Sequence, residues 1–222
     1  MEKTTDCKIP NATAKRIPLY YRYLKMLEES KVERIKSKDF SQLIQVPSAT
    51  IRRDFSHFGE LGRSGYGYDV SYLIEVFSHI LNTQVEKRIA LIGAGNLGKA
   101  LGKNNFRRNE NLTIVAAFDS DPELIGTKIN NVEIYSMDDL ASIVAKEGIT
   151  TAISTVPSKH SQGAVDKMVE AGITAILNFS PGRVKVPKNV KIQYIDLTTE
   201  LQTLIYFDEN FSSNQQFNFA NS

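Results

Sequence analysis

Two kinds of spacing between apolar residues divide this chain into two predicted parts. Up to about residue 82 the apolar positions recur at helical spacing, which predicts helices over about 17–27, 38–44, 49–58 and 70–81. Beyond that point, short apolar runs at 88–92, 112–118, 133–135, 151–154 and 175–179 alternate with helix-like segments. That alternation predicts an α/β domain with a parallel sheet. We expect one domain at 1–82, a second at 83–192, and a terminal amphipathic helix with a polar tail at 193–222.

The first predicted strand ends in a glycine-rich turn with the pattern GxGxxG. Its members are Gly93, Ala94, Gly95, Asn96, Leu97 and Gly98. A strand, this turn and then a helix is the order that places a dinucleotide pyrophosphate on the positive end of a helix. The pattern therefore predicts a dinucleotide-binding, Rossmann-like domain.

An acidic residue follows the second predicted strand, as that interpretation requires. Asp119 lies 21 residues beyond Gly98, where a carboxylate holds the adenine ribose hydroxyls and repels a 2′-phosphate. This favours NADH and NAD+ over the phosphorylated cofactor; the alternative is a polar turn after a strand. The expected cofactor contacts are the six turn residues together with Asp119, Ser120, Asp121, Thr155, Val156, Pro157, Asn178 and Phe179.

The first domain has the pattern of a helix-turn-helix. Ser37 and Ser48 are the expected caps of the second and third helices. In the third helix Ile51, Phe55 and Phe58 share the inward face, so its arginine and hydroxyl groups remain for a DNA major groove. Residues 59–68 are rich in glycine and aromatic residues, which predicts a hairpin wing. The expected DNA contacts are Arg16, Lys36, Ser48, Thr50, Arg52, Arg53, Ser56, His57, Arg63, Gly65 and Tyr66.

Charge supports a polyanionic partner for this first domain only. The whole chain has a net charge of +2, but residues 15–63 hold 11 basic and 6 acidic side chains. An ordinary three-helix domain with a solvated basic face is the alternative. Cys7 is the only cysteine, so no internal disulfide forms. We expect a cytoplasmic protein with no membrane span, secretion signal or metal site.

The complete set of motifs resembles the Rex family of redox-sensing transcriptional repressors. The resemblance covers about residues 9–208 and rests on segments 47–62, 65–68, 93–98, 118–122, 155–157 and 178–181. It implies a winged-helix DNA-binding domain, a Rossmann-like NAD(H) domain and a C-terminal helix exchanged between subunits. It also implies a homodimer that binds an inverted-repeat operator and releases it when NADH binds. Such a protein is a regulator and not an enzyme.

The resemblance further implies a contact between subunits that operates the switch. By motif position it involves Arg22 of the first helix and Asp196 ahead of the exchanged helix. Some family members have a tyrosine after the glycine-turn helix, where this chain has Asn104. An amide lacks the ring and the titratable hydroxyl of tyrosine. We also expect the partner's Leu197 to help enclose the nicotinamide.

Two other functions are compatible with parts of the sequence. An NAD-dependent dehydrogenase would need a proton donor beside the nicotinamide, and the C-terminal domain offers His160 with Lys159 beside it. A nucleotide-regulated scaffold would make no use of the polar face of the third helix. NADH absorbance with candidate hydroxy acids and a mobility-shift assay would separate these alternatives from a repressor.

Overall fold

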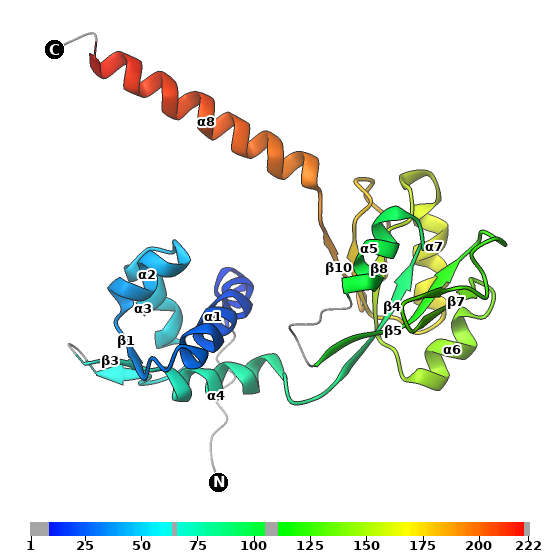
Figure 1. Ribbon diagram of the computed structural model, residues 1–222, viewed down its shortest axis with the longest axis horizontal. Coiled ribbons are helices and arrows are strands. Elements are labelled where there is room, and N and C mark those ends of the chain that lie inside the picture. Colours follow the sequence, from blue (N-terminus) through cyan, green and yellow to red (C-terminus); the bar gives the residue numbers. More distant parts are fainter. Residues whose placement is uncertain (1–8, 64–65, 105–110, 220–222) are drawn as a thin grey trace. The chain divides into compact units, whose positions relative to one another are not determined.

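The computed structural model describes residues 9–63, 66–104 and 111–219. It divides into two compact units, residues 1–85 and 86–222 (Figure 1). The α/β class is confirmed, with a Rossmann-like parallel sheet in the second unit.

In its described residues, the first unit has four helices and a small antiparallel sheet. Its elements are α1 Asn11–Glu29, β1 Arg34–Ile35, α2 Ser37–Ile44, α3 Ser48–Ser56, β2 Gly62–Arg63, β3 Gly67–Asp69 and α4 Val70–Leu81. Aromatic rings fill its core: Tyr20 lies edge-on to Phe55 at 5.4 Å between ring centres, and Phe77 lies at the same distance from Phe55. These rings pack α1 and α4 against the helix-turn-helix.

Helix boundaries in the first unit correct several sequence predictions. Ser37 and Ser48 are the first residues of α2 and α3, so the caps are Lys36 and Pro47 instead, and neither makes a side-chain capping bond. The first helix begins six residues earlier than predicted and keeps Pro18 in its interior; Thr13, in the added residues, is buried and holds them against the unit. The predicted cap of α4 is confirmed: Asp69 Oδ1 accepts a hydrogen bond from the Tyr72 amide at 3.0 Å.

The predicted wing hairpin is confirmed, and it is part of a three-stranded sheet. β3 lies between β2 and β1, with Arg63 opposite Gly67 and Arg34 opposite Asp69. Because β1 leads directly into α2, this sheet joins the wing to the start of the helix-turn-helix. Of the predicted wing contacts, Gly65 lies outside the described residues.

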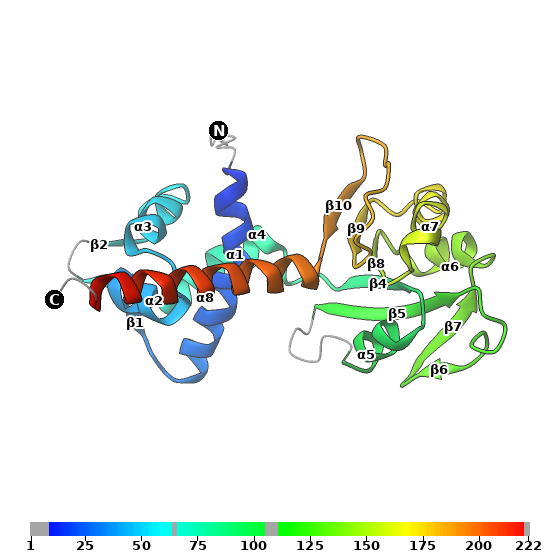
Figure 2. The same ribbon diagram turned by 90° about the horizontal axis from the view of Figure 1, so that it is seen from above.

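The described residues of the second unit form a seven-stranded sheet with helices on both faces (Figure 2). Its elements are β4 Lys87–Ile92, α5 Asn96–Asn104, β5 Leu112–Asp119, β6 Lys128–Ile129, β7 Val132–Ser136, α6 Leu140–Glu147, β8 Thr151–Ser154, α7 Ser158–Glu170, β9 Ala175–Asn178, β10 Lys191–Tyr194 and α8 Leu197–Phe219. The strand order is β10-β9-β8-β4-β5-β7-β6, and only β6 runs antiparallel to its neighbour. The order in which strands are added to the sheet reverses at β4, from β5 on one side to β8 on the other, and ligands bind at such a point in open α/β sheets.

Successive apolar side chains of β4 pack on alternate faces of the sheet, which explains how both faces are covered. Ala90 and Ile92 belong to an apolar cluster with residues of α6 and α7, whereas Ile89 and Leu91 belong to a cluster on the side of α5. Successive side chains of a strand point to opposite faces. The sheet is thus buried on both sides, and its ligand-facing edge is formed by the turns at the strand ends.

Helix α8 exposes large apolar side chains along the part for which side chains are described. Leu197, Leu201, Leu204 and Phe207 are each more than half exposed. Within the described part of the chain, none of the helices combines the length and the apolar character that a membrane span requires.

Candidate functional site

The glycine turn between β4 and α5 is packed so closely that two of its positions exclude a side chain. A Cβ at Gly98 would stand 2.0 Å from the carbonyl oxygen of Gly93. Gly93 itself has a φ of +92°, which L side chains rarely adopt. Around Gly95, by contrast, no described atom lies within 4 Å of the Cβ position. The turn is therefore tight on its inner side and open where a ligand would approach its backbone.

Asp119 contacts this turn from the end of β5. Its Oδ2 accepts a hydrogen bond from the Ala94 amide at 2.6 Å, and its Oδ1 accepts from the amides of Ser120 and Asp121 at 2.7 and 3.0 Å. These bonds fix the carboxylate beside the glycine turn. A carboxylate oxygen accepts about two hydrogen bonds, so within the described residues Oδ2 keeps room for a ligand hydroxyl.

Thr155 ties the end of β8 to the same turn. Its Oγ1 donates to the carbonyl oxygen of Gly93 at 2.8 Å, and its amide donates to the carbonyl oxygen of Ile92 at 2.8 Å. Val156 and Phe179 pack against the apolar clusters on opposite faces of the sheet. The predicted cofactor residues thus meet at the carboxyl ends of β4, β5, β8 and β9.

Asn178 is buried at the end of β9, beside Ser154 of β8. Its side-chain oxygen accepts a hydrogen bond from the Ser180 amide at 3.2 Å. That contact shapes the corner that carries Phe179, whereas Pro157 is exposed at the start of α7. His160, the proton donor that a dehydrogenase would need, is also exposed there.

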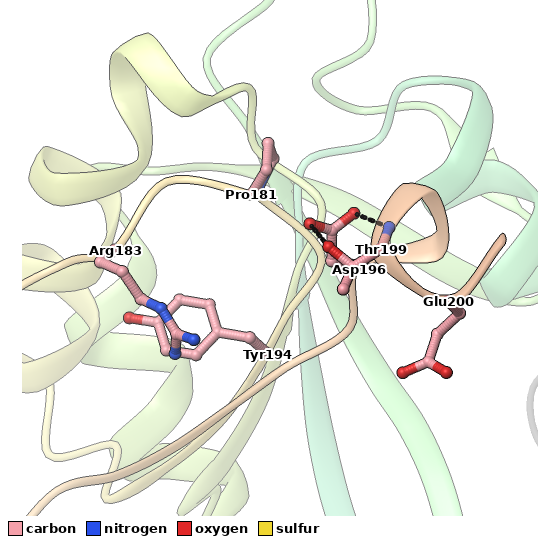
Figure 3. Close-up of a pocket in the computed structure, with 6 residues that line it drawn as sticks. All are labelled: Pro181, Arg183, Tyr194, Asp196, Thr199 and Glu200. Carbon is pink, nitrogen blue, oxygen red and sulfur yellow. Dashed lines mark hydrogen bonds between the residues drawn. The ribbon is translucent and has the colours of Figure 1, made fainter. Parts of the chain in front are cut away.

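A hollow of about 190 Å³ lies one strand further along the sheet (Figure 3). Its lining consists of Pro181, Arg183, Tyr194, Asp196, Thr199 and Glu200. The Arg183 guanidinium lies 4.3 Å from the centre of the Tyr194 ring. Asp196 begins α8 by accepting hydrogen bonds from the amide and the hydroxyl of Thr199, at 3.3 and 2.8 Å. The hydroxyl bond lowers the pKa of Asp196.

Helix α3 presents the polar face that the sequence predicts for DNA. Arg52, Arg53 and Ser56 are exposed, and Ser48, Thr50 and His57 are partly exposed. An Arg52 nitrogen lies 3.3 Å from Ser37 Oγ and 3.4 Å from Ser48 Oγ, so both hydroxyls steer this guanidinium. Exposed Lys36 precedes the same Ser37.

The wing adds a cationic group that is not among the predicted DNA contacts. The Arg34 guanidinium lies 4.7 Å from the centre of the Tyr66 ring and 3.7 Å from an Asp69 carboxylate oxygen. Tyr66 itself is 68% exposed. A strand of two residues has too few positions to show an alternating pattern. The pairing of Arg34 with Asp69 therefore could not be predicted from the sequence. The backbone of Arg63 lies in β2, opposite Gly67.

Arg16 extends from α1 to a buried carboxylate on α3. Its Nε lies 2.6 Å from Asp54 Oδ2, and its Nη2 lies 2.8 Å from Asp54 Oδ1. Thr13 Oγ1 donates to Oδ1 at 2.8 Å, and Tyr20 Oη donates to Oδ2 at 2.5 Å. Burial raises the pKa of Asp54, but these hydrogen bonds outweigh it, and the net pKa is lowered. The bond to Asp54 raises the pKa of Arg16.

Of the residues that the resemblance assigns to the switch, three are exposed and Asp196 is partly exposed. Arg22 is exposed on α1, Asn104 is exposed as the last residue of α5, and Leu197 is 69% exposed. The described residues hold no group of three or more His, Cys, Asp or Glu side chains arranged to bind a metal ion.

Two family models match separate parts of the chain. A model described as "CoA binding domain" matches residues 84–182, and one described as "Putative DNA-binding protein N-terminus" matches residues 8–56. A relative from Enterococcus faecalis, called redox-sensing transcriptional repressor Rex 2, is 72% identical over 205 residues. The match covers 92% of this chain and 95% of that protein.

Solved structures of the protein RSP, described as a Rex-family repressor, have the same fold. The complex of RSP with β-NAD+ and operator DNA is 32% identical, with a TM-score of 0.84 over 94% of this chain and 96% of the other. The complex of RSP with β-NADH has the same TM-score at 31% identity, over 95% of this chain and 99% of the other.

Proposed function

Because the chain belongs to the Rex family of redox-sensing transcriptional repressors, we propose that its first unit binds double-stranded operator DNA and its second binds NADH and NAD+. This makes it a redox-sensing DNA-binding repressor and not a dehydrogenase. The observation that carries the proposal is the hydrogen bond between Asp119 and the Ala94 amide. It holds the carboxylate expected to bind the ribose hydroxyls beside the glycine turn.

The residues of the turn fit a dinucleotide. Gly95 leaves its outer side open, so a pyrophosphate can approach the backbone amides at the start of α5. Asp119 would hold the ribose hydroxyls and disfavour a 2′-phosphate. The remaining contacts that we propose are with Ala94, Asn96, Leu97, Ser120, Asp121, Thr155, Val156, Pro157, Asn178 and Phe179.

The first unit would read DNA with α3 in the major groove and the wing on the backbone. Arg52 and Arg53 are exposed in adjacent positions, and arginine binds guanine edges or phosphates through its planar fork. Ser48, Thr50, Ser56 and His57 flank them on the same helix. Lys36, Arg63 and Tyr66 would contact the DNA backbone beside it.

We propose that two chains in the cytoplasm form a homodimer through α8. A helix with exposed Leu197, Leu201 and Leu204 needs an apolar surface to cover it, and a second copy supplies that surface by exchange. Arg22 of one subunit would then meet Asp196 of the other, with Asn104 nearby. A two-fold dimer matches an inverted-repeat operator because the two α3 helices occupy successive half-sites.

Discrimination between the two redox forms would depend on the nicotinamide pocket. The oxidised ring carries a positive charge that the reduced ring lacks, and burying an unpaired cation is costly. Val156, Phe179 and the second subunit's copy of Leu197 would supply apolar walls that accept only the neutral ring. Shifting the dimer from 1:99 to 99:1 in favour of the released form requires about 5.5 kcal/mol of preferential binding, shared between two sites.

Operator binding titrated with NADH against a constant background of NAD+ tests the proposal. We expect progressive release of the duplex by the wild-type chain, and little response from Asp119→Ala. Release that is equal with either redox form would contradict it. Sedimentation of a Leu201→Asp, Leu204→Asp variant tests the dimer: we expect monomers, since each charge would be buried in the exchanged contact.

A further inference from the structure

A buried anion sits on the inner face of the helix proposed to read DNA. Asp54 is 1% exposed, although its neighbours Arg52 and Arg53 are exposed. Its two carboxylate oxygens accept four hydrogen bonds, two from Arg16 and one each from Thr13 and Tyr20. All four come from α1, so the carboxylate joins these two helices at one point.

Packing alone does not require a charge at this position. A buried ion pair gains little over apolar side chains of similar volume, whereas removing one partner is costly. What the pair adds is geometry, because the planar guanidinium forms two parallel bonds with the carboxylate. Tyr20 reinforces this by donating to Asp54 while its ring lies edge-on to Phe55, the next residue of α3. Rotation of α3 about its own axis would break all of these contacts together.

The same contacts determine what Arg16 can offer to DNA. Two of its donors point to Asp54, and its side chain is only 29% exposed. Its positive charge is balanced by the carboxylate that it holds. A phosphate could bind only the three remaining donors, and it would meet a guanidinium whose charge Asp54 already neutralises.

We propose that Asp54 is the positioning residue of α3, and that Arg16 serves operator recognition by holding Asp54 rather than by contacting a phosphate. This inference rests on the proposed DNA-binding function. It assigns Thr13 and Tyr20 to the same task and sets the direction in which Arg52 and Arg53 project.

Three measurements separate positioning from a phosphate contact and from a general effect on folding. The probe is a duplex that the wild-type chain selects from a randomised library, compared with a shuffled duplex of the same length. The readouts are affinity for each duplex, the dependence of log K on log salt, and thermal unfolding. The variants are Arg16→Met, Arg16→Lys, Asp54→Asn and Thr13→Val. Lys15→Met is the matched control, because it removes an exposed positive charge from the position of α1 that precedes Arg16.

For Arg16→Met and Asp54→Asn we expect selected-duplex affinity to fall on the order of tenfold or more, while shuffled-duplex affinity falls much less. The salt slope should stay within about half a unit of wild type, since no phosphate contact is lost. A folding defect would lower both affinities by the same factor, and a lost phosphate contact would lower both and reduce the slope by about 0.9 per contact. Either of those results overturns the inference.

The other two variants, Arg16→Lys and Thr13→Val, keep the test decisive if Asp54→Asn is poorly folded. Arg16→Lys retains the charge but not the fork, and Thr13→Val removes one donor, so each should lower the ratio of selected to shuffled affinity with the slope unchanged. An unchanged ratio in both would overturn the inference. Combining Arg16→Met with Asp54→Asn should cost little more than Arg16→Met alone, and additive losses would contradict a shared task. If the wild-type chain selects no sequence at all, the DNA-binding proposal itself fails.

Discussion

The two segments that we propose to contact ligands are held in place by opposite means. Helix α3 is fixed by charged and polar side chains, with Asp54 bound to donors of α1. The glycine turn is fixed mainly by its backbone, with the Gly93 carbonyl oxygen 2.0 Å from where a Cβ of Gly98 would stand. An anchor of side chains fails when a charge or a donor is removed, whereas an anchor of close backbone contact fails when volume is added.

The largest effect that we expect comes from adding volume to the turn. Gly98→Ala places a methyl group against the Gly93 backbone, which cannot move without distorting the turn. Overpacking of this kind costs up to about 3 kcal/mol. Because the distortion falls on the turn that would bind the cofactor, NADH affinity should fall by up to about two orders of magnitude. Calorimetric titration measures it, and wild-type affinity would contradict the backbone anchor.

Two other glycines provide controls for that experiment. Gly95→Ala meets no described atom, so thermal stability should be unchanged while NADH affinity falls, because the methyl group occupies the pyrophosphate approach. Gly163→Ala on the exposed side of α7 also meets no described atom. It should leave NADH affinity unchanged and add up to about 1 kcal/mol of stability.

The next largest effect comes from removing an exposed charge of α3. Arg53→Ala should lower operator affinity by about 10- to 100-fold, since a good base contact contributes about 1–3 kcal/mol. NADH affinity should stay the same, because the residue belongs to the other unit. A mobility-shift assay with calorimetry on the same sample checks both; a joint loss would mean that the two sites are not separate.

An effect of similar size should follow removal of Asp119, the carboxylate that we propose holds the ribose. Asp119→Ala loses an acceptor for the ribose and the bond to the Ala94 amide. A hydrogen bond to a charged group contributes about 1.5–3 kcal/mol, so NADH affinity should fall at least about tenfold. The variant should also bind the 2′-phosphorylated cofactor more strongly relative to NADH, which a competition titration measures.

The smallest effect concerns pH, and it should appear in the first unit alone. Hydrogen bonds from α1 hold the pKa of Asp54 below its ordinary value. The ionised carboxylate therefore stabilises the folded unit fully above the unfolded pKa of about 3.9. This stabilisation is lost as the pH falls through the lower folded value. Denaturant unfolding followed from pH 6 downward should show this loss in wild type. If Asp54→Asn leaves the dependence of the unfolding free energy on pH unaltered, the loss of stability comes from other carboxylates.

How far the sequence could predict these features depends on how far apart the partners lie. The glycine turn and its acid follow a local pattern, so their meeting at the strand ends was predictable. The Arg16–Asp54 contact spans 38 residues, and charge counting alone made Arg16 another candidate for DNA. β10 was missed because its alternating exposure at the sheet edge gives only a weak apolar run, and β6 has just two residues.

The contacts of the first unit have a consequence for how the protein is made. Its most distant described strand pairing joins Arg34 to Asp69, and the core rings of α1, α3 and α4 all lie within residues 1–85. Both partners of each of these described contacts have therefore been translated before the glycine turn is synthesised. Since domains fold as units during synthesis, the nascent chain can complete its DNA-reading half on the ribosome before its redox-sensing half is complete.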